Sequence, residues 1–116
     1  MLTSPISITI AGTAHSLSRV NQDNFCATYF KRGANYEIQL DIRHSREKAT
    51  VTGQMERHNM DLKWTSFDAD GKPTTTQTYH VVRPVRGSDG ALAVDLEKAL
   101  CAFSTANVAT IVGWES

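Results

Sequence analysis

Polar and apolar side chains alternate through residues 53–64, GQMERHNMDLKW. Successive side chains of an extended strand point to opposite faces, so Arg57, Asn59 and Lys63 would share one face. Arginine and lysine are the side chains that contact phosphate groups, and asparagine offers a donor and an acceptor to base edges. The spacing therefore predicts a strand with one apolar face and one face suited to contact a nucleic acid.

Two other stretches carry the same kind of polar face. In YEIQLDIRH, residues 36–44, the odd-numbered side chains are polar or charged and the even-numbered ones are mostly apolar. In residues 74–86 we expect Tyr79 and Val81 to point to the core, which puts Thr76, Thr78 and His80 on the polar face. The candidate contacts, with one loop residue included, are Gln39, Arg43, Arg46, Arg57, Asn59, Lys63, Thr76, Thr78 and His80.

A second interpretation of this polar face stays open. Glu37, Asp41 and Asp61 alternate with the cations and dilute their charge. Side chains of opposite charge on neighbouring strands pair across a sheet. The face could therefore be a solvated surface held by cross-strand ion pairs, with no ligand.

The sequence offers little support for an enzyme or a metal protein. Its four histidines form no zinc-type pair, and it contains no nucleophile elbow and no glycine-rich phosphate loop. Glu56 and His58 could form an acid–base pair, but a polar rim of the sheet is by far the better explanation. Asp68 and Asp70 could hold a divalent cation, although an acidic turn in water is the simpler interpretation. We expect no enzymatic activity and no cofactor.

Length and composition predict one small domain. The chain has 116 residues, a formal net charge of zero and 41% hydrophobic residues, so residues 1–116 are expected to form a single unit. A net charge of zero argues against a protein that binds nucleic acid nonspecifically over its whole surface. No leader or membrane-spanning run is evident, which favours a cytosolic protein whose Cys26 and Cys101 stay reduced.

The order of the predicted elements indicates an antiparallel α+β fold. A hairpin is expected over residues 6–12 and 15–20, followed by strands over 25–32, 36–44, 51–67 and 74–86. Ser88 or Asp89 would cap a first helix, and Ser104 or Thr105 would cap a second, shorter helix that ends at Gly113. The strands come first and the helices last.

Two helices are a thin cover for a sheet of this size. A stripe at helical spacing comprises Leu92, Leu96, Leu100 and Phe103. The sheet of the same chain offers too little surface for this stripe to pack on. We therefore expect it to pack across a two-fold axis, in an interlocked homodimer.

Several motifs together resemble the coat proteins of single-stranded RNA bacteriophages, most closely those of phages that infect Caulobacter. The resemblance runs over nearly the whole chain and is carried by ITIAGTA, RVNQDNF, IRHSRE, MERHNMDL, YHVVR, DLEKAL and the terminal IVGWES. Of these, MERHN and GWES are the most distinctive. The number of residues, the order of strands and the terminal helices agree with the architecture of that family.

The resemblance implies a specific assembly. It implies an N-terminal hairpin, a five-stranded antiparallel sheet, and two helices that interlock in a dimer over a ten-stranded sheet. Such dimers would build an icosahedral capsid in the bacterial cytoplasm, with no membrane partner. The inner sheet face would bind genomic single-stranded RNA, and an RNA hairpin bound there could also repress replicase translation. The alternative is a small dimeric RNA-binding regulator that forms no shell.

The resemblance also suggests which residues face the RNA. It adds Asp41 and Ser45 to the candidates on the first of the three polar strands. Enterobacterial members of the family stack an RNA base on a tyrosine of the last strand, and the matching position here is Thr76. Tyr79 is expected to be out of phase with that position, so a stacking contact of this kind is not expected.

Overall fold

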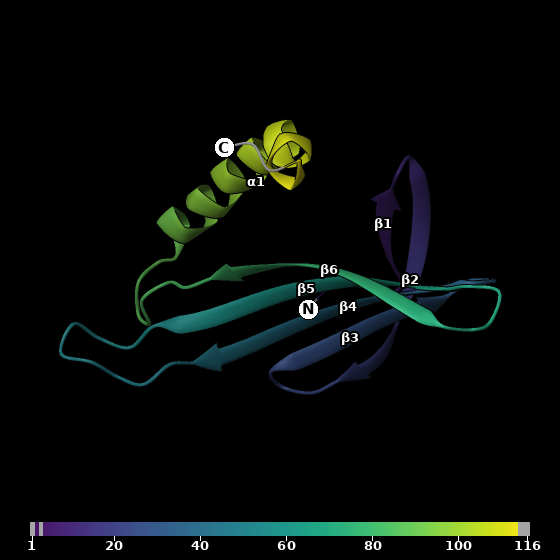
Figure 1. Cartoon of the computed structure of the whole chain (residues 1–116). Coiled ribbons are helices and arrows are strands. Elements are labelled where there is room, and N and C mark those ends of the chain that lie inside the picture. Colours follow the sequence, from purple (N-terminus) through teal and green to yellow (C-terminus); the bar gives the residue numbers. More distant parts are fainter. Residues whose placement is uncertain (1, 3, 114–116) are drawn as a thin grey trace.

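A six-stranded antiparallel sheet and one helix make up the described part of the chain (Figure 1). The structure is a computed structural model that describes residue 2 and residues 4–113; residues 114–116, which belong to the GWES motif, lie outside the described part. The strands follow one another in sequence order across the sheet. The elements are β1 (Ile6–Ile10), β2 (Thr13–Gln22), β3 (Cys26–Arg32), β4 (Tyr36–Arg46), β5 (Glu56–Phe67), β6 (Pro73–Val82) and α1 (Ala91–Val112).

The predicted N-terminal hairpin is continuous with the rest of the sheet. Ala11 and Gly12 both have positive φ, at 51° and 83°, as a tight two-residue hairpin turn requires. The first half of β2 pairs with β1, with Leu17 opposite Ile6, and its second half pairs with β3, with Ser18 opposite Phe30. Strand β2 thus belongs both to the hairpin and to a five-stranded sheet formed by β2–β6. Together with β1, these strands form one six-stranded sheet.

The core lies where the hairpin folds over the sheet. Leu17, Tyr29 and Ile38 are fully buried. Tyr36 and Trp64 stack beside them, with ring centroids 4.6 Å apart. In Figure 1, β1 and the adjoining half of β2 stand up from the sheet at one end, so this core belongs to that end.

The prediction of two C-terminal helices is wrong, because α1 is continuous from Ala91 to Val112. The residues expected to cap a second helix lie inside the first. The Thr105 hydroxyl donates a hydrogen bond to the carbonyl oxygen of Cys101 at 2.9 Å, one turn back along the same helix. A hydroxyl bonded in this way needs no helix terminus and bends the helix. Figure 1 shows the yellow C-terminal half of α1 turned away from the direction of its first turns.

Helix α1 makes little contact with the sheet. None of its residues is buried. The helix and the hairpin both rise from the same face of the sheet (Figure 1), and the opposite face is left bare. No helix in the described chain has the length and apolar character needed to cross a membrane.

Candidate nucleic-acid interface

The bare face of the sheet collects the polar side chains of β4 and β5. The two strands pair with Gln39 opposite Lys63, Arg43 opposite Asn59 and Ser45 opposite Arg57. Since directly opposed residues point to the same face of an antiparallel pair, the predicted residues of these two strands do share one face. We call this surface, formed by the odd-numbered residues of β4, β5 and β6, the polar face.

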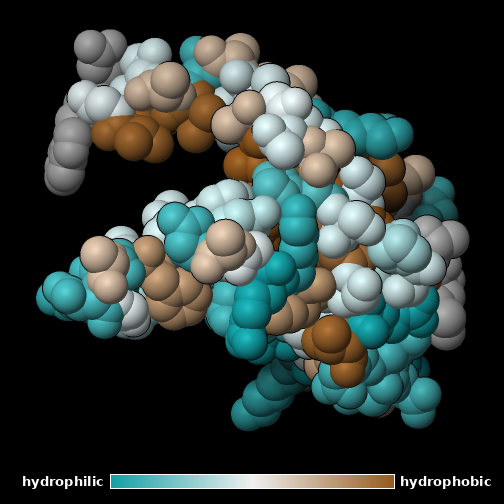
Figure 2. All heavy atoms as spheres, turned by 90° about the vertical axis from the view of Figure 1, so that its right-hand side faces the viewer, coloured by the Kyte–Doolittle hydropathy of each residue, from teal (hydrophilic) through white to brown (hydrophobic). Residues whose placement is uncertain are grey.

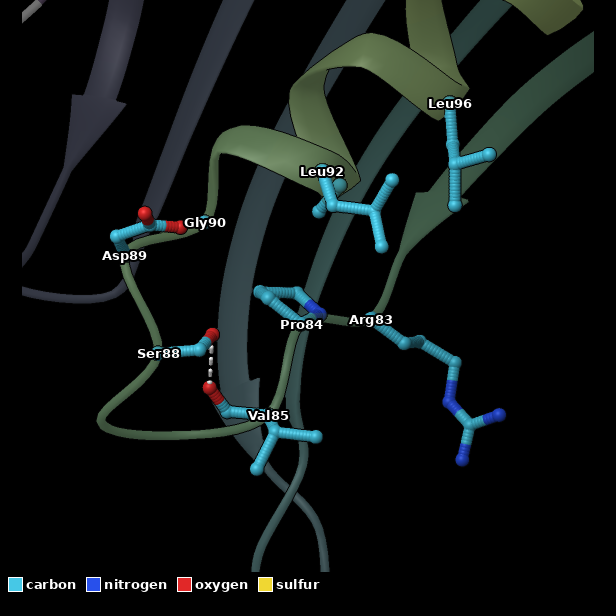
Figure 3. Close-up of a pocket in the computed structure, with 9 residues that line it drawn as sticks. Arg83, Pro84, Val85, Ser88, Asp89, Gly90, Leu92 and Leu96 are labelled. Carbon is cyan, nitrogen blue, oxygen red and sulfur yellow. Dashed lines mark hydrogen bonds between the residues drawn. The ribbon is translucent and has the colours of Figure 1, made fainter.

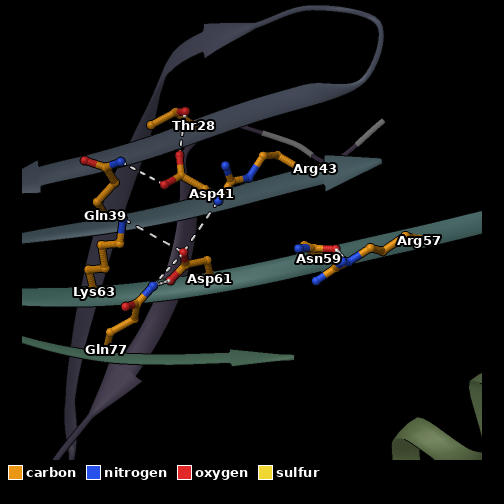
Figure 4. A network of polar contacts seen from close by, with 9 residues as sticks. All are labelled: Thr28, Gln39, Asp41, Arg43, Arg57, Asn59, Asp61, Lys63 and Gln77. Atoms are coloured by element: carbon orange, nitrogen blue, oxygen red, sulfur yellow. Dashed lines mark hydrogen bonds and ion pairs between the residues drawn. The ribbon is translucent and has the colours of Figure 1, made fainter. Parts of the chain in front are cut away.

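Two aspartates lie opposite each other at the centre of the polar face (Figure 4). Asp41 accepts hydrogen bonds from the Thr28 hydroxyl at 2.7 Å and from the Gln39 amide at 2.8 Å. Both carboxylate oxygens of Asp61 accept from the Gln77 amide nitrogen at 2.8 Å. Because opposed like charges repel and Asp61 is only 6% exposed, these donors offset a real cost.

Two of the predicted cations lean toward this aspartate pair. An Arg43 guanidinium nitrogen lies 3.6 Å from Asp61, and the Lys63 amine lies 3.9 Å from the same carboxylate oxygen. The side chains of Arg43 and Lys63 are 54% and 36% exposed, so their charged groups remain accessible while they neutralise Asp61. At its centre the polar face therefore matches the ion-paired interpretation of the sequence.

Arg57 and Asn59 stand apart from the aspartates (Figure 4). The Arg57 guanidinium donates a hydrogen bond to the Asn59 side-chain oxygen at 3.2 Å. That bond orients the guanidinium without neutralising it, since an amide carries no charge. An oriented cation beside an amide is the kind of pair that holds a phosphate and reads an adjacent base.

The predicted placement of Thr76, Thr78 and His80 on the polar face is wrong. In β6, Thr78 lies opposite Leu62 and His80 lies opposite Met60, which belong to the face under α1. The physical reason is that this stretch, TTTQTYHVV, has polar residues at both odd and even positions. No alternation of polar and apolar residues therefore shows which side chains face the core. Arg46, which lies opposite Glu56, is also an even-numbered residue and therefore belongs to the face on the α1 side.

The same register brings two residues to the polar face that the sequence analysis missed there. Gln77 lies opposite Lys63, and Tyr79 lies opposite Asp61. Tyr79 is 64% exposed, so its ring offers a flat aromatic surface beside the charged groups. The signal that bears on this phase is the length of the β5–β6 turn: with Phe67 paired to Pro73, counting outward puts Tyr79 opposite Asp61.

A second polar cluster lies between β6 and α1. His80 Nδ1 is 2.5 Å from Glu97 Oε1, and the Cys101 thiol donates a hydrogen bond to the same oxygen at 3.2 Å. This hydrogen bond, with burial and the carboxylate charge, raises the pKa of Cys101 above its ordinary value. The thiol is therefore protonated at neutral pH, so it is not an activated nucleophile.

Other candidate residues are occupied in structural contacts. Asp68 accepts hydrogen bonds from the backbone N–H groups of Asp70 and Lys72 at 2.9 and 2.8 Å, so its carboxylate shapes the β5–β6 turn. His58 contacts Glu56 through one ring nitrogen and His44 through the other. Beyond the sheet, Arg83 bonds Glu47 through two nitrogens, a contact that lowers the pKa of Glu47.

Comparisons with known proteins give two findings. The family described as "Phage phiCb5, coat protein" matches residues 3–84, more than half of the chain. A solved structure titled "Virus-like particle of bacteriophage AVE019" is similar with a TM-score of 0.52 and 12% sequence identity, over 90% of this chain and 88% of that chain. At this identity the likeness shows a shared fold. No curated protein matches the sequence.

Proposed function

This chain belongs to the family of the phage phiCb5 coat protein, and we propose that it acts as an RNA-binding dimer that assembles into an icosahedral shell. Membership makes it a structural capsid protein of a bacteriophage virion rather than an enzyme. One observation carries the finer proposal: in the described chain, the helix has an exposed apolar stripe and no buried residue, and the opposite side of the sheet is a bare polar face.

The apolar surface of α1 supports the dimer. Leu92, Leu96, Leu100 and Phe103 are between 56% and 70% exposed. Fully burying a leucine or phenylalanine side chain stabilises a protein by about 1.5–3 kcal/mol. Val94, Val108 and Val112 on other sides of the helix are exposed as well, so apolar side chains outside the stripe also lack a covering surface within this chain. We infer that a second copy supplies that surface.

The space around α1 has room for a second copy. Figure 2 shows hydrophobic side chains on the lower side of the upper part of the molecule, where the helix lies. An open hollow lies below them. An apolar pocket of about 280 Å³ at the base of the helix, seen in Figure 3, is lined by Pro84, Val85, Leu92 and Leu96 among others. A side chain from the partner subunit would fill this pocket.

The edge of the sheet supports the same arrangement. β6 is the last strand in the order, and its residues from Pro73 to Tyr79 are exposed. Its outer backbone groups are free to pair with another strand. Two β6 strands that meet antiparallel across a two-fold axis would join β2–β6 of both copies into a ten-stranded sheet. The helix of each copy would then lie over the sheet of the other.

Leu96→Asp should abolish the dimer. The change puts a charge into the apolar stripe of both copies, and burying an unpaired carboxylate costs far more than the leucine contributed. We expect wild type to sediment as a dimer or larger species, and the variant to yield no soluble folded protein. Asp95→Asn, next in sequence and off the stripe, should behave as wild type. A folded, stable monomer from Leu96→Asp, or a monomeric wild type, contradicts the interlocked dimer.

RNA would lie on the polar face, which points into the shell in this proposal. Arg57 and Arg43 would contact phosphates, with Asn59 and Ser45 beside them. Tyr79 would stack on a base, because an exposed ring among cations is what single-stranded RNA uses for stacking. A stacked base gives the subunit a means to hold a hairpin loop, and hence to repress replicase translation from that hairpin.

Arg57→Ala should weaken RNA binding through the loss of a phosphate contact. Each contact contributes about 0.7–1 to the slope of log affinity against log salt. We therefore expect lower affinity at low salt and a slope shallower by about that amount, measured by filter binding or fluorescence anisotropy with a single-stranded RNA. Lys98→Ala removes a cation from α1 instead and should leave both quantities unchanged. Equal salt slopes for Arg57→Ala and wild type would move the RNA site elsewhere.

Tyr79→Ala and Thr78→Ala form a matched pair that tests the face. The two residues are neighbours on β6 with opposite parity. Loss of one base–aromatic stack costs about 1–3 kcal/mol, a fall in affinity of about 5- to 150-fold. We expect that fall for Tyr79→Ala, with the salt slope unchanged because no charge is lost, and no change for Thr78→Ala. The reverse result would mean that RNA binds on the α1 side.

Purified protein should contain closed particles that carry RNA. Electron micrographs are expected to show uniform shells, and absorbance at 260 nm in the particle fraction should exceed that of protein alone. RNA bound to dimers without any shell, under conditions that preserve virions, would favour the alternative of a small RNA-binding regulator.

A further inference from the structure

The His80–Glu97–Cys101 cluster has the composition and geometry of a metal site. We propose that these three side chains bind a zinc ion that fastens α1 to β6 of its own chain. The inference does not depend on RNA binding or on shell assembly. It rests on three ligand atoms of different type that come from two separate elements and lie within 4.8 Å of one another.

The distances between the ligand atoms fit a tetrahedral ion. Zinc bonds of about 2.0–2.3 Å place pairs of nitrogen, oxygen and sulfur ligands roughly 3.4–3.6 Å apart. Here Cys101 Sγ is 3.7 Å from His80 Nδ1 and 3.2 Å from Glu97 Oε1. The separation between His80 Nδ1 and Glu97 Oε1 is 2.5 Å, so this pair must open by somewhat less than 1 Å. Small rotations of two partly exposed side chains supply that movement.

The backbone already holds the three ligands together. Glu97 and Cys101 are four residues apart in α1, which puts them on the same side of one helical turn. His80 lies in β6 and reaches them across the gap. Within the described chain, the side-chain hydrogen bonds between α1 and the sheet all involve His80. An ion at this point would therefore act on a polar link that already joins helix and sheet.

The donor types select the kind of ion. Calcium and magnesium take oxygen ligands, whereas a thiolate with an imidazole and a carboxylate suits zinc and similar transition ions. On binding, the thiol proton of Cys101 passes to water, and His80 takes the tautomer that carries its proton on Nε2, so that the Nδ1 lone pair faces the ion. The side chains of His80 and Glu97 are 37% and 17% exposed, so water can occupy a fourth position.

The other histidine cluster lacks this convergence. His58 uses Nε2 toward Glu56 at 3.3 Å and Nδ1 toward His44 at 2.8 Å. Ligand atoms on opposite sides of one ring cannot meet at a single ion. Among the described residues the His80 cluster is therefore the group suited to hold a metal.

Cobalt(II) gives a direct test with the full chain, reduced and freed of metal. We expect one equivalent of Co²⁺ per chain to produce the visible bands of a tetrahedral ion and a near-ultraviolet thiolate-to-cobalt band, and Zn²⁺ to displace both. Cys101→Ser should abolish the thiolate band. Cys26→Ser removes the other cysteine and should leave the spectrum unchanged.

Two further variants keep the test decisive if Cys101→Ser does not fold. His80→Gln and Glu97→Gln, checked for folding by circular dichroism, should each weaken Co²⁺ binding by at least about 10- to 100-fold, the loss that even an outer partner of a metal site causes. A folded wild type that gives no thiolate band overturns the proposal. So does a band that survives Cys101→Ser or disappears in Cys26→Ser.

Discussion

The antiparallel register of β4 and β5 is the constraint on which the rest of the structure depends. It pairs the strands from Tyr36 with Ser66 to Arg46 with Glu56. A slip of one residue would exchange the two faces of the strand that slipped. On the α1 side, Leu40 opposite Leu62 favours this register, while on the polar face it forces Asp41 against Asp61. The neutral donors and cations around those aspartates make the apolar pairing compatible with two opposed charges.

The sequence predicted the parts of the sheet in which polar and apolar residues alternate. β4 alternates cleanly, and the pairing of β4 with β5 brought Gln39, Arg43 and Arg57 to one face as expected. The same reasoning could not show which side chains of β6 lie on which face. Its threonines occupy both faces, and Tyr79 considered alone resembles a core residue. Its exposure on the polar face follows from pairing with β5, a nonlocal interaction that strand composition does not encode.

The helix shows a different limit of sequence reasoning. Ser104 and Thr105 favour helix starts, so a break between two helices was a fair local prediction. In the observed helix the Thr105 hydroxyl donates instead to an acceptor within the helix itself, the carbonyl oxygen of Cys101, so it caps no helix start. Likewise, the spacing of Cys101 from His80 gave no hint of a cluster. The two residues meet only because the chain turns back after β6 and lays the first half of α1 near that strand.

The formal net charge of the chain is zero, and its polar face likewise balances cations with aspartates, which suits a protein that acts in many copies. The aspartates at its centre draw Arg43 and Lys63 toward them, which leaves Arg57 as the cation whose bonded partner is uncharged. One such face would hold RNA weakly at physiological salt. In the proposed shell, however, one RNA molecule spans many copies, so weak contacts add through a high effective concentration. Subunits without net charge repel one another little. The low net charge that limits the RNA affinity of one dimer therefore favours assembly of the whole shell.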